Sequence, residues 1–285
     1  MTASPLPISS GYQCPLCEAP LIPETNNKTY TCIKRHSFDC AKEGYLNLLP
    51  VQHKHSKEPG DNKVMLDARR LFLEDSFYEP LAKAIALIIN AIQVPNRVGH
   101  ILDLGCGEGY YTRKLAELCQ SSSQIKLYGN DISKFAISAA AKKQKTAQFI
   151  VASSNKLPYE SNFFDIVVRV FAPSDATELL RILKTSGYLL TVTPGPRHLW
   201  QIKEHIYTEV KEHTEAAEIP DGFIQLSSQR ISYKISPNAE QRTALLQMTP
   251  FAWSASEEIK AKLNAIDELT IETDFIVTLF VNNSD

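Results

Sequence analysis

Residues 100–111 read His-Ile-Leu-Asp-Leu-Gly-Cys-Gly-Glu-Gly-Tyr-Tyr and change from an apolar run to three alternate glycines. The apolar run predicts a strand that is covered on both faces, as in a parallel sheet. Gly105, Gly107 and Gly109 allow a tight turn and let a ligand approach without Cβ atoms in the way. Residues 110–118 continue as an amphipathic helix, whose unpaired N–H groups attract a polar or anionic group. The stretch therefore predicts a strand, a cofactor-binding loop and a helix.

The glycine spacing and an acid farther along indicate the kind of cofactor. Dinucleotide sites favour G-x-G-x-x-G, whereas residues 103–109 give D-x-G-x-G-x-G, which resembles the S-adenosylmethionine loop of class I methyltransferases. Asp131 ends the next predicted strand, 22 residues after Gly109, where a ribose diol requires a carboxylate acceptor. Together these signals predict a nucleoside-containing cofactor, S-adenosylmethionine in particular. The alternative is a structural turn with a chance acid.

Size and composition allow one α/β core and a smaller module, because the chain has 285 residues, 44% hydrophobic and 22% charged. No apolar run is long enough for a membrane-spanning helix and no secretory signal is evident, so we expect a cytoplasmic protein. The formal charge of −2 argues against indiscriminate nucleic-acid binding. Residues 28–70, however, carry nine Lys or Arg against five acids, a charge of +4 that leaves −6 elsewhere. This basic region suggests where a polyanion would bind.

Four potential metal ligands stand near the N-terminus. Cys14 and Cys17 form a C-x2-C pair, and Cys32 and His36 form a C-x3-H pair after fourteen intervening residues. Two such pairs on tight turns have the ligand number and loop sizes of a structural zinc site. A redox pair at the first two cysteines is the rival interpretation, and Cys40 is an alternative fourth ligand.

The predicted zinc would fold a segment that is too small to have a core of its own. We expect this folded segment to hold RNA. The basic loop that follows it, with Lys54, His55 and Lys57, is a candidate for contact with phosphates. A solvated, purely structural loop is the alternative.

Alternating strand and helix patterns predict an α/β fold with a doubly wound, mostly parallel sheet. Two helices, at residues 61–74 and 77–92, precede the first strand. Strands are then predicted at 125–130, 148–154, 164–171 and 188–193, and helices at 133–145, 176–183 and 201–212. Two β-prone runs, at 224–235 and 269–281, suggest an antiparallel end of the sheet. Ligands bind at the carboxyl ends of the parallel strands in such folds.

Six segments of the chain together resemble one family of bacterial enzymes. They are residues 14–17, 41–53, 59–61, 103–112, 194–199 and 246–253, the last reading Leu-Gln-Met-Thr-Pro-Phe-Ala-Trp. This combination resembles the RlmA family of 23S rRNA guanine-N1 methyltransferases from about Cys14 to the C-terminus. The resemblance implies a zinc-binding RNA-recognition module at 1–60 and a Rossmann-like class I methyltransferase domain at 61–285. It also implies S-adenosylmethionine as methyl donor, a guanine in a 23S rRNA hairpin as acceptor, and a homodimer.

The same resemblance assigns roles to individual residues. The zinc ligands would be Cys14, Cys17, Cys32 and His36. The cofactor contacts fall on Tyr78, Glu108, Gly109 and His198, beside the Gly105, Gly107 and Asp131 already discussed. Many class I methyltransferases keep an acid for the adenine amine at the end of strand three, where this chain has Ser153 and Ser154. A serine hydroxyl or a backbone group must accept the hydrogen bond of the adenine amine there.

Methylation of guanine N1 requires an unpaired or flipped base, loss of the N1 proton, and alignment of N1 with the methyl group. Phe171, Tyr111 and Trp200 are candidates to stack on the base, with core packing as the alternative. His198 either takes the proton or, as we favour, hydrogen-bonds the cofactor. The sequence identifies no general base.

Arg197 and Lys203 are candidates to neutralise phosphates, although exposed charges at the start of a helix usually do nothing specific. Two other function classes stay open. One is a zinc-containing small-molecule methyltransferase, and the other is a catalytically silent RNA-binding adaptor. Steep loss of affinity with salt would distinguish an RNA enzyme from an enzyme of small metabolites.

Overall fold

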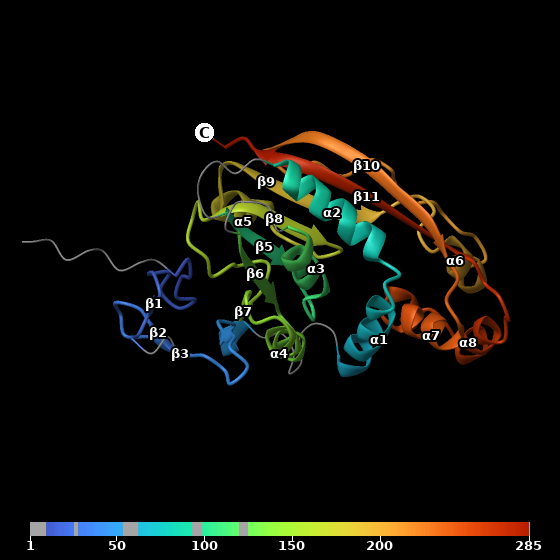
Figure 1. Cartoon of the computed structure of the whole chain (residues 1–285), viewed down its shortest axis with the longest axis horizontal. Helices are drawn as coiled ribbons and strands as arrows, with labels where there is room; N and C mark the ends of the chain where they lie inside the picture. Colours follow the sequence, from blue (N-terminus) through green and yellow to red (C-terminus); the bar gives the residue numbers. More distant parts are fainter. Residues whose placement is uncertain (1–9, 26–27, 54–61, 93–98, 120–124, 285) are drawn as a thin grey trace, which may run out of the picture.

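A computed structural model describes residues 10–25, 28–53, 62–92, 99–119 and 125–284 of the chain. Its centre is an eight-stranded sheet of order β10-β11-β9-β8-β5-β6-β7-β4 (Figure 1). The strands are β4 (Leu46–Asn47), β5 (Gly99–Leu104), β6 (Ile125–Asp131), β7 (Gln148–Val151), β8 (Phe164–Val170), β9 (Leu183–Pro194), β10 (Phe223–Ile235) and β11 (Ile271–Asn282). Pairing is parallel from β4 to β9 and antiparallel for β11 and β10. The predicted fold class, including the antiparallel end, is confirmed.

Helices cover both faces of this sheet. They are α1 (Lys63–Glu74), α2 (Glu79–Ala91), α3 (Tyr110–Leu118), α4 (Lys134–Lys143), α5 (Ala176–Ile182), α6 (Trp200–Ile206), α7 (Ala239–Gln247) and α8 (Glu257–Asn264), with 3-10 turns η1 (Val51–His53) and η2 (Pro250–Trp253). Side chains alternate across each strand, so Ile101 of β5 packs into the core with α2 and α3, while Leu102 packs into the core with α5. Capping side chains fix several helix starts, among them Asn62 for α1 and Ser133 for α4.

Two predicted boundaries were wrong by five residues or more. The helix predicted at 201–212 ends at Ile206, and residues 207–222 form a long connection with little regular structure. β9 begins at Leu183, five residues before the predicted strand, because its first residues pair with β8 through an irregular register. Both errors lie beyond the apolar stretches that the sequence patterns detected.

A small antiparallel sheet forms the N-terminal module. It consists of β1 (Ile22–Pro23), β2 (Thr29–Thr31) and β3 (Ser37–Asp39). Tyr12 anchors the module on the large sheet, because its buried ring packs against Tyr159 at 5.7 Å and Tyr128 at 6.3 Å. The Tyr12 hydroxyl also donates to Gln148 Oε1 at 3.0 Å. The module is thus part of one continuous core with the parallel sheet.

The predicted boundary between residues 60 and 61 stays a prediction. β4 lies before that boundary but pairs with β7 at the edge of the large sheet. The basic loop with Lys54, His55 and Lys57 lies outside the described residues. Within the described part of the chain, no helix has both the length and the apolar character needed to cross a membrane.

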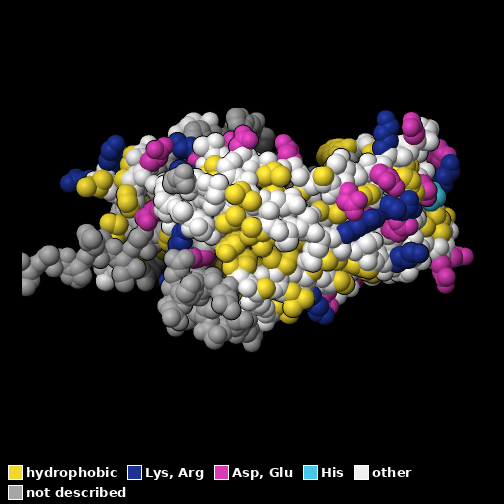
Figure 2. Space-filling model, turned by 90° about the horizontal axis from the view of Figure 1, so that it is seen from above, with side chains coloured by type: hydrophobic (Ala, Val, Ile, Leu, Met, Phe, Trp, Pro, Cys, Tyr) yellow, Lys and Arg dark blue, Asp and Glu magenta, His cyan; other side chains and the backbone are white. Residues whose placement is uncertain are grey.

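One face of the molecule is poor in charged side chains at its middle. Figure 2 shows hydrophobic side chains gathered there, with acidic and basic side chains toward both ends of the molecule. Strand β10 lies along the top of the molecule (Figure 1), at the edge of the large sheet, and exposes Ile224 and Leu226. An exposed edge strand with apolar side chains can pair with another chain.

Candidate cofactor and metal sites

The glycine-rich loop connects β5 to α3 at the carboxyl edge of the parallel strands. All three glycines have left-handed φ values, of 71°, 54° and 73° for Gly105, Gly107 and Gly109. A Cβ on Gly105 would lie 2.5 Å from the Cβ of Ala172, whereas a Cβ on Gly107 would meet only Arg69 Nη1, at 3.8 Å. Packing therefore requires glycine at 105, while open space lies over the Cα of Gly107. That space is where the sequence predicts the cofactor.

Asp131 ends β6 directly beside this loop. Its Oδ2 accepts from the Gly107 N–H at 3.0 Å, and its Oδ1 accepts from the Ser133 N–H at 2.8 Å. Each carboxylate oxygen has two acceptor positions, so a carboxylate held by two backbone donors can still accept hydroxyl groups. The predicted ribose acid and the predicted loop are thus brought together.

Asp103, the first residue of the glycine motif, lies below the loop. It is buried and accepts from the Thr112 hydroxyl at 2.6 Å. Burial raises the pKa of Asp103 to about 6, although the Thr112 hydrogen bond opposes this shift. Its carboxylate fixes the start of α3 against the end of β5.

Glu108 is buried in the loop, and its carboxylate is bound by Arg70 of α1. Arg70 Nε donates to Glu108 Oε2 at 2.7 Å, and Arg70 Nη2 donates to Oε1. The pair raises the pKa of Arg70. The Glu108 side chain therefore holds α1 over the glycine-rich loop. The sequence did not predict this role of Arg70. The one signal was the position of Arg70 on the basic side of the helix predicted at residues 61–74.

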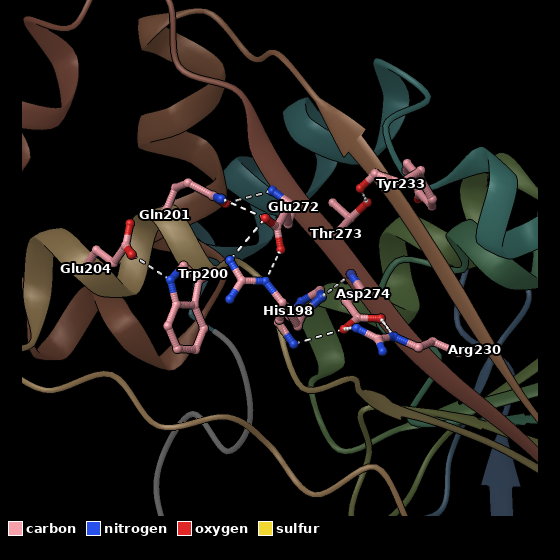
Figure 3. A network of polar contacts seen from close by, with 10 residues as sticks. His198, Trp200, Gln201, Glu204, Arg230, Tyr233, Glu272, Thr273 and Asp274 are labelled. Atoms are coloured by element: carbon pink, nitrogen blue, oxygen red, sulfur yellow. Dashed lines mark hydrogen bonds and ion pairs between the residues drawn. The ribbon is translucent and has the colours of Figure 1, made fainter.

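His198 and Tyr78, two of the predicted cofactor contacts, lie close together. The ring centroid of Tyr78 is 6.3 Å from that of His198, and both rings pack against Phe275, at 5.0 and 4.8 Å. His198 Nδ1 accepts from the Asp274 N–H at 3.2 Å, which places the proton of the neutral ring on Nε2 (Figure 3). Burial lowers the pKa of His198 to about 3, and the nearby Lys203 contributes. His198 is therefore a neutral hydrogen-bond donor.

A network of ion pairs surrounds His198 (Figure 3). The buried carboxylate of Asp274 accepts from Arg230 Nε and Nη2, both at 2.8 Å. Arg197 Nε donates to Glu272 Oε2 at 2.6 Å. Arg197 is thus engaged within the protein instead of being offered to a phosphate. No periodic pattern in the sequence indicated these pairs, because each joins residues more than 40 positions apart.

The three aromatic candidates for base stacking differ in their surroundings. Phe171 directly follows β8 and has a left-handed φ of 55°; it is 46% exposed, and its ring centroid lies 5.8 Å from that of His198. The Arg197 guanidinium covers Trp200 at 4.4 Å. The Tyr111 ring packs edge-on against Tyr110 at 5.1 Å. Phe171 is the candidate with an exposed ring beside the cofactor loop.

The four predicted zinc ligands converge at the N-terminal module. His36 Nδ1 lies 3.4 Å from the Sγ atoms of both Cys14 and Cys32, and Cys17 Sγ lies 3.6 Å from Cys32 Sγ. The four ligand atoms all lie within 4.8 Å of one another. Cys40 is outside this group, in a bridge with Leu46. The structure therefore favours His36 over Cys40 as the fourth ligand, and four converging ligands fit a metal better than a redox pair.

Comparison with known proteins assigns the chain to a family. Residues 12–57 match the family described as RlmA, N-terminal, and residues 96–252 match a methyltransferase domain. A putative 23S rRNA (guanine-N1)-methyltransferase, YxjB of Bacillus subtilis (strain 168), is 30% identical over 94% of this chain and 96% of its own length. The chain belongs to the RlmA methyltransferase family.

Two further RlmA relatives cover nearly the whole chain. The 23S rRNA (guanine(748)-N1)-methyltransferase of Streptomyces fradiae is 28% identical over 93% of this chain and 95% of its own length. A putative 23S rRNA (guanine-N1)-methyltransferase of Micromonospora griseorubida is 27% identical over 90% of this chain and 92% of its own length. The resemblance predicted from the motifs is therefore confirmed, and the chain is a methyltransferase.

The residues present fit the two groups that this family implies. For S-adenosylmethionine, Asp131 and the open space at Gly107 suit a nucleoside, and the buried Tyr111 hydroxyl and Asn130 Oδ1 have no hydrogen-bond partner among the described residues. Ser153, at the predicted adenine position, has its Oγ bound by the Asn155 N–H at 3.2 Å. For zinc, three thiols and one imidazole at these separations suit tetrahedral coordination.

Proposed function

We propose that the protein transfers the methyl group of S-adenosylmethionine to N1 of a guanine in a hairpin of 23S rRNA. The observation that carries this proposal is the combination, in one core, of a zinc-ligand cluster and a glycine-rich loop with its ribose acid. Its support also includes the named activities of the three relatives, which span almost the same length as this chain.

The cofactor contacts are Tyr78, Gly105, Gly107, Glu108, Gly109, Asp131 and His198. In this site, the Asp131 carboxylate accepts the ribose hydroxyls and the loop backbone lies along the cofactor. His198 donates through its Nε2–H. Its other nitrogen, Nδ1, already accepts from the Asp274 N–H, so the ring has no nitrogen available to take a proton from the substrate. The bound cofactor supplies an electrophilic methyl group. Orientation of the acceptor and exclusion of water then contribute most of the catalysis.

Phe171 supports the acceptor base. A non-glycine residue with a left-handed φ costs free energy and is common at functional sites. An exposed aromatic ring beside the cofactor loop can stack on an unpaired base, which contributes about 1–3 kcal/mol. Stacking would hold the guanine that has been removed from its stem.

The zinc module contacts the RNA through the turn between its two downstream ligands. Cys32 and His36 enclose Ile33, Lys34 and Arg35, whose side chains are exposed. Two cations on a rigid, metal-held turn suit the phosphates of an RNA hairpin. Lys54 and Lys57, later in the same basic region of the sequence, add two further cations.

The active form is a homodimer in the cytoplasm. Support for the dimer comes from the exposed edge strand β10, with Ile224 and Leu226, and from the uncharged middle of that face (Figure 2). A second copy would cover such a surface. Sedimentation of the purified protein measures the oligomeric state directly.

Methyl transfer to a 23S rRNA transcript tests the proposal. The purified, zinc-loaded protein, incubated with cofactor labelled in the methyl group, should label a hairpin RNA and yield 1-methylguanosine after digestion. Activity should fall steeply between low and moderate salt, because phosphate contacts release counterions. Labelling of a small metabolite without salt dependence would support the small-molecule alternative. Cofactor binding and RNA binding without transfer would support the silent adaptor.

A further inference from the structure

Lys203 is a buried lysine that takes part in none of the ion pairs described above and is not among the proposed cofactor contacts. It lies on α6, and its N–H donates to the Leu199 carbonyl at 3.1 Å. The residue is 4% exposed, and its Nζ has no hydrogen-bond partner in the described part of the chain. A buried ammonium group without a partner destabilises a fold. Such a group requires an explanation, and a catalytic role in which a ligand supplies the missing partner is one.

The charged groups around Lys203 do not satisfy it. Asp274 on β11 acts on the pKa of Lys203, but Arg230 binds its carboxylate twice and the Arg197 N–H donates to it at 2.9 Å. The other titratable neighbours are His198 before α6 and His213 after it; burial lowers the pKa of both, and Lys203 lowers each further. Burial lowers the pKa of Lys203 itself. The Nζ donors are thus left for a ligand.

A series of contacts connects Lys203 with the acceptor side of the cofactor site. The Lys203 N–H donates to the carbonyl of Leu199, the residue that follows His198, and His198 packs against Phe171. Ala172, the next residue, packs against Gly105 of the cofactor loop. His198 therefore brings one hydrogen-bond donor, Nε2–H, beside the proposed stacking ring, and Lys203 on the adjoining first turns of α6 carries a second, unpaired donor. A carbonyl oxygen of a stacked base is the kind of group that two donors recognise.

We propose that Lys203 binds O6 of the acceptor guanine and stabilises the negative charge that O6 gains when N1 loses its proton. This role rests on the proposed function. The N1–H bond breaks and its proton passes to solvent water. The N1 electron pair then forms the bond to the methyl carbon, while the carbon–sulfur bond breaks and its electron pair stays on sulfur. Adenine carries an amino donor in place of O6, so the same contact selects guanine.

Substitution of Lys203 separates this role from a structural one. Lys203→Met removes the donor and keeps the length of the side chain. We expect kcat for methyl transfer to fall about 100-fold or more, as after loss of an oxyanion donor, with the Kd for S-adenosylmethionine unchanged. Because an unpaired buried charge is removed, the unfolding temperature should stay equal or rise. Lys211→Ala, at an exposed lysine in the following segment, is the control and should retain activity.

An RNA hairpin with 6-thioguanosine at the target position reports the O6 contact itself. Sulfur is a weak hydrogen-bond acceptor. Replacing guanosine by 6-thioguanosine should therefore lower the methylation rate of the wild type by a larger factor than that of Lys203→Met. Lys203→Gln, which keeps a neutral donor, should show an intermediate rate. Equal rates for wild type and Lys203→Met, or equal sensitivity of both to the sulfur replacement, would overturn the role of Lys203. A wild type that methylates no guanine-containing RNA would instead refute the proposed function.

Discussion

Substitution of Gly107 by valine should abolish cofactor binding and leave the fold intact. The residue has φ = 54°, where an L side chain costs about 1–2 kcal/mol. A Cβ there meets only Arg69 Nη1, at 3.8 Å, so steric overlap adds little to that cost. For a chain of this size the unfolding temperature should fall by about 2–4 °C for each kcal/mol. The valine side chain, however, would fill the space over the loop, and calorimetric titration should detect no S-adenosylmethionine binding.

Gly44→Val is the matched control for this substitution. Gly44 also has a left-handed φ, of 99°, and a Cβ there would have nothing within 4 Å. It lies in the turn between β3 and β4, where its N–H donates to the Ala41 carbonyl at 2.9 Å, and it is not part of the glycine-rich loop. This variant should therefore show the backbone cost alone, with normal cofactor affinity. Normal titration of Gly107→Val, or equal loss of affinity in both variants, would refute the placement of the cofactor.

Three further predictions concern the metal, the buried histidine and α1. Cys14→Ser should remove the metal, measured by atomic absorption, and should reduce RNA methylation more than cofactor affinity; retained zinc would contradict the ligand set. The pKa of His198 is lowered to about 3 in the folded protein, from about 6.5 in the unfolded chain. Below pH 6.5 the unfolded chain binds a proton that the folded protein does not, so the stability present above pH 6.5 is lost as the pH falls toward 3. When the pH falls from 7 to 5, the wild type should therefore lose about 2 kcal/mol more of its free energy of unfolding than His198→Asn does. Urea titrations measure this loss, and the same loss in both proteins would contradict the lowered pKa of His198. Arg70→Met should raise the KM for S-adenosylmethionine and lower the free energy of unfolding by about 1–3 kcal/mol, because it leaves the buried Glu108 carboxylate without its partner; an unchanged KM would show that α1 needs no link to Glu108.

The sequence predicted those features that depend on neighbouring residues. The apolar run at 101–104 and the three glycines determine a strand and a turn locally, so β5 and its loop were located within a residue. The metal cluster was predictable for the same reason, because the spacing of each ligand pair sets its loop. Asp131 could be placed because parallel strands end at one edge of a sheet.

The sequence could not predict contacts that depend on tertiary packing. Lys203 follows the start of a helix and has the sequence context of an exposed charge, yet α6 packs on β11 and α8 and buries it. Arg230 and Asp274 pair across two antiparallel strands, and their meeting depends on a register that no local pattern specifies. β4 was missed because two residues are too few to show a period of two.

Reverse-transcription mapping of 23S rRNA from a strain that lacks this protein tests the central claim most directly. A methyl group on guanine N1 blocks base pairing, so wild-type rRNA should stop the polymerase at one guanine in a hairpin. We predict that this stop disappears in the deletion strain and returns with the intact gene but not with Gly107→Val. A pattern of stops that is identical with and without the protein would contradict the account.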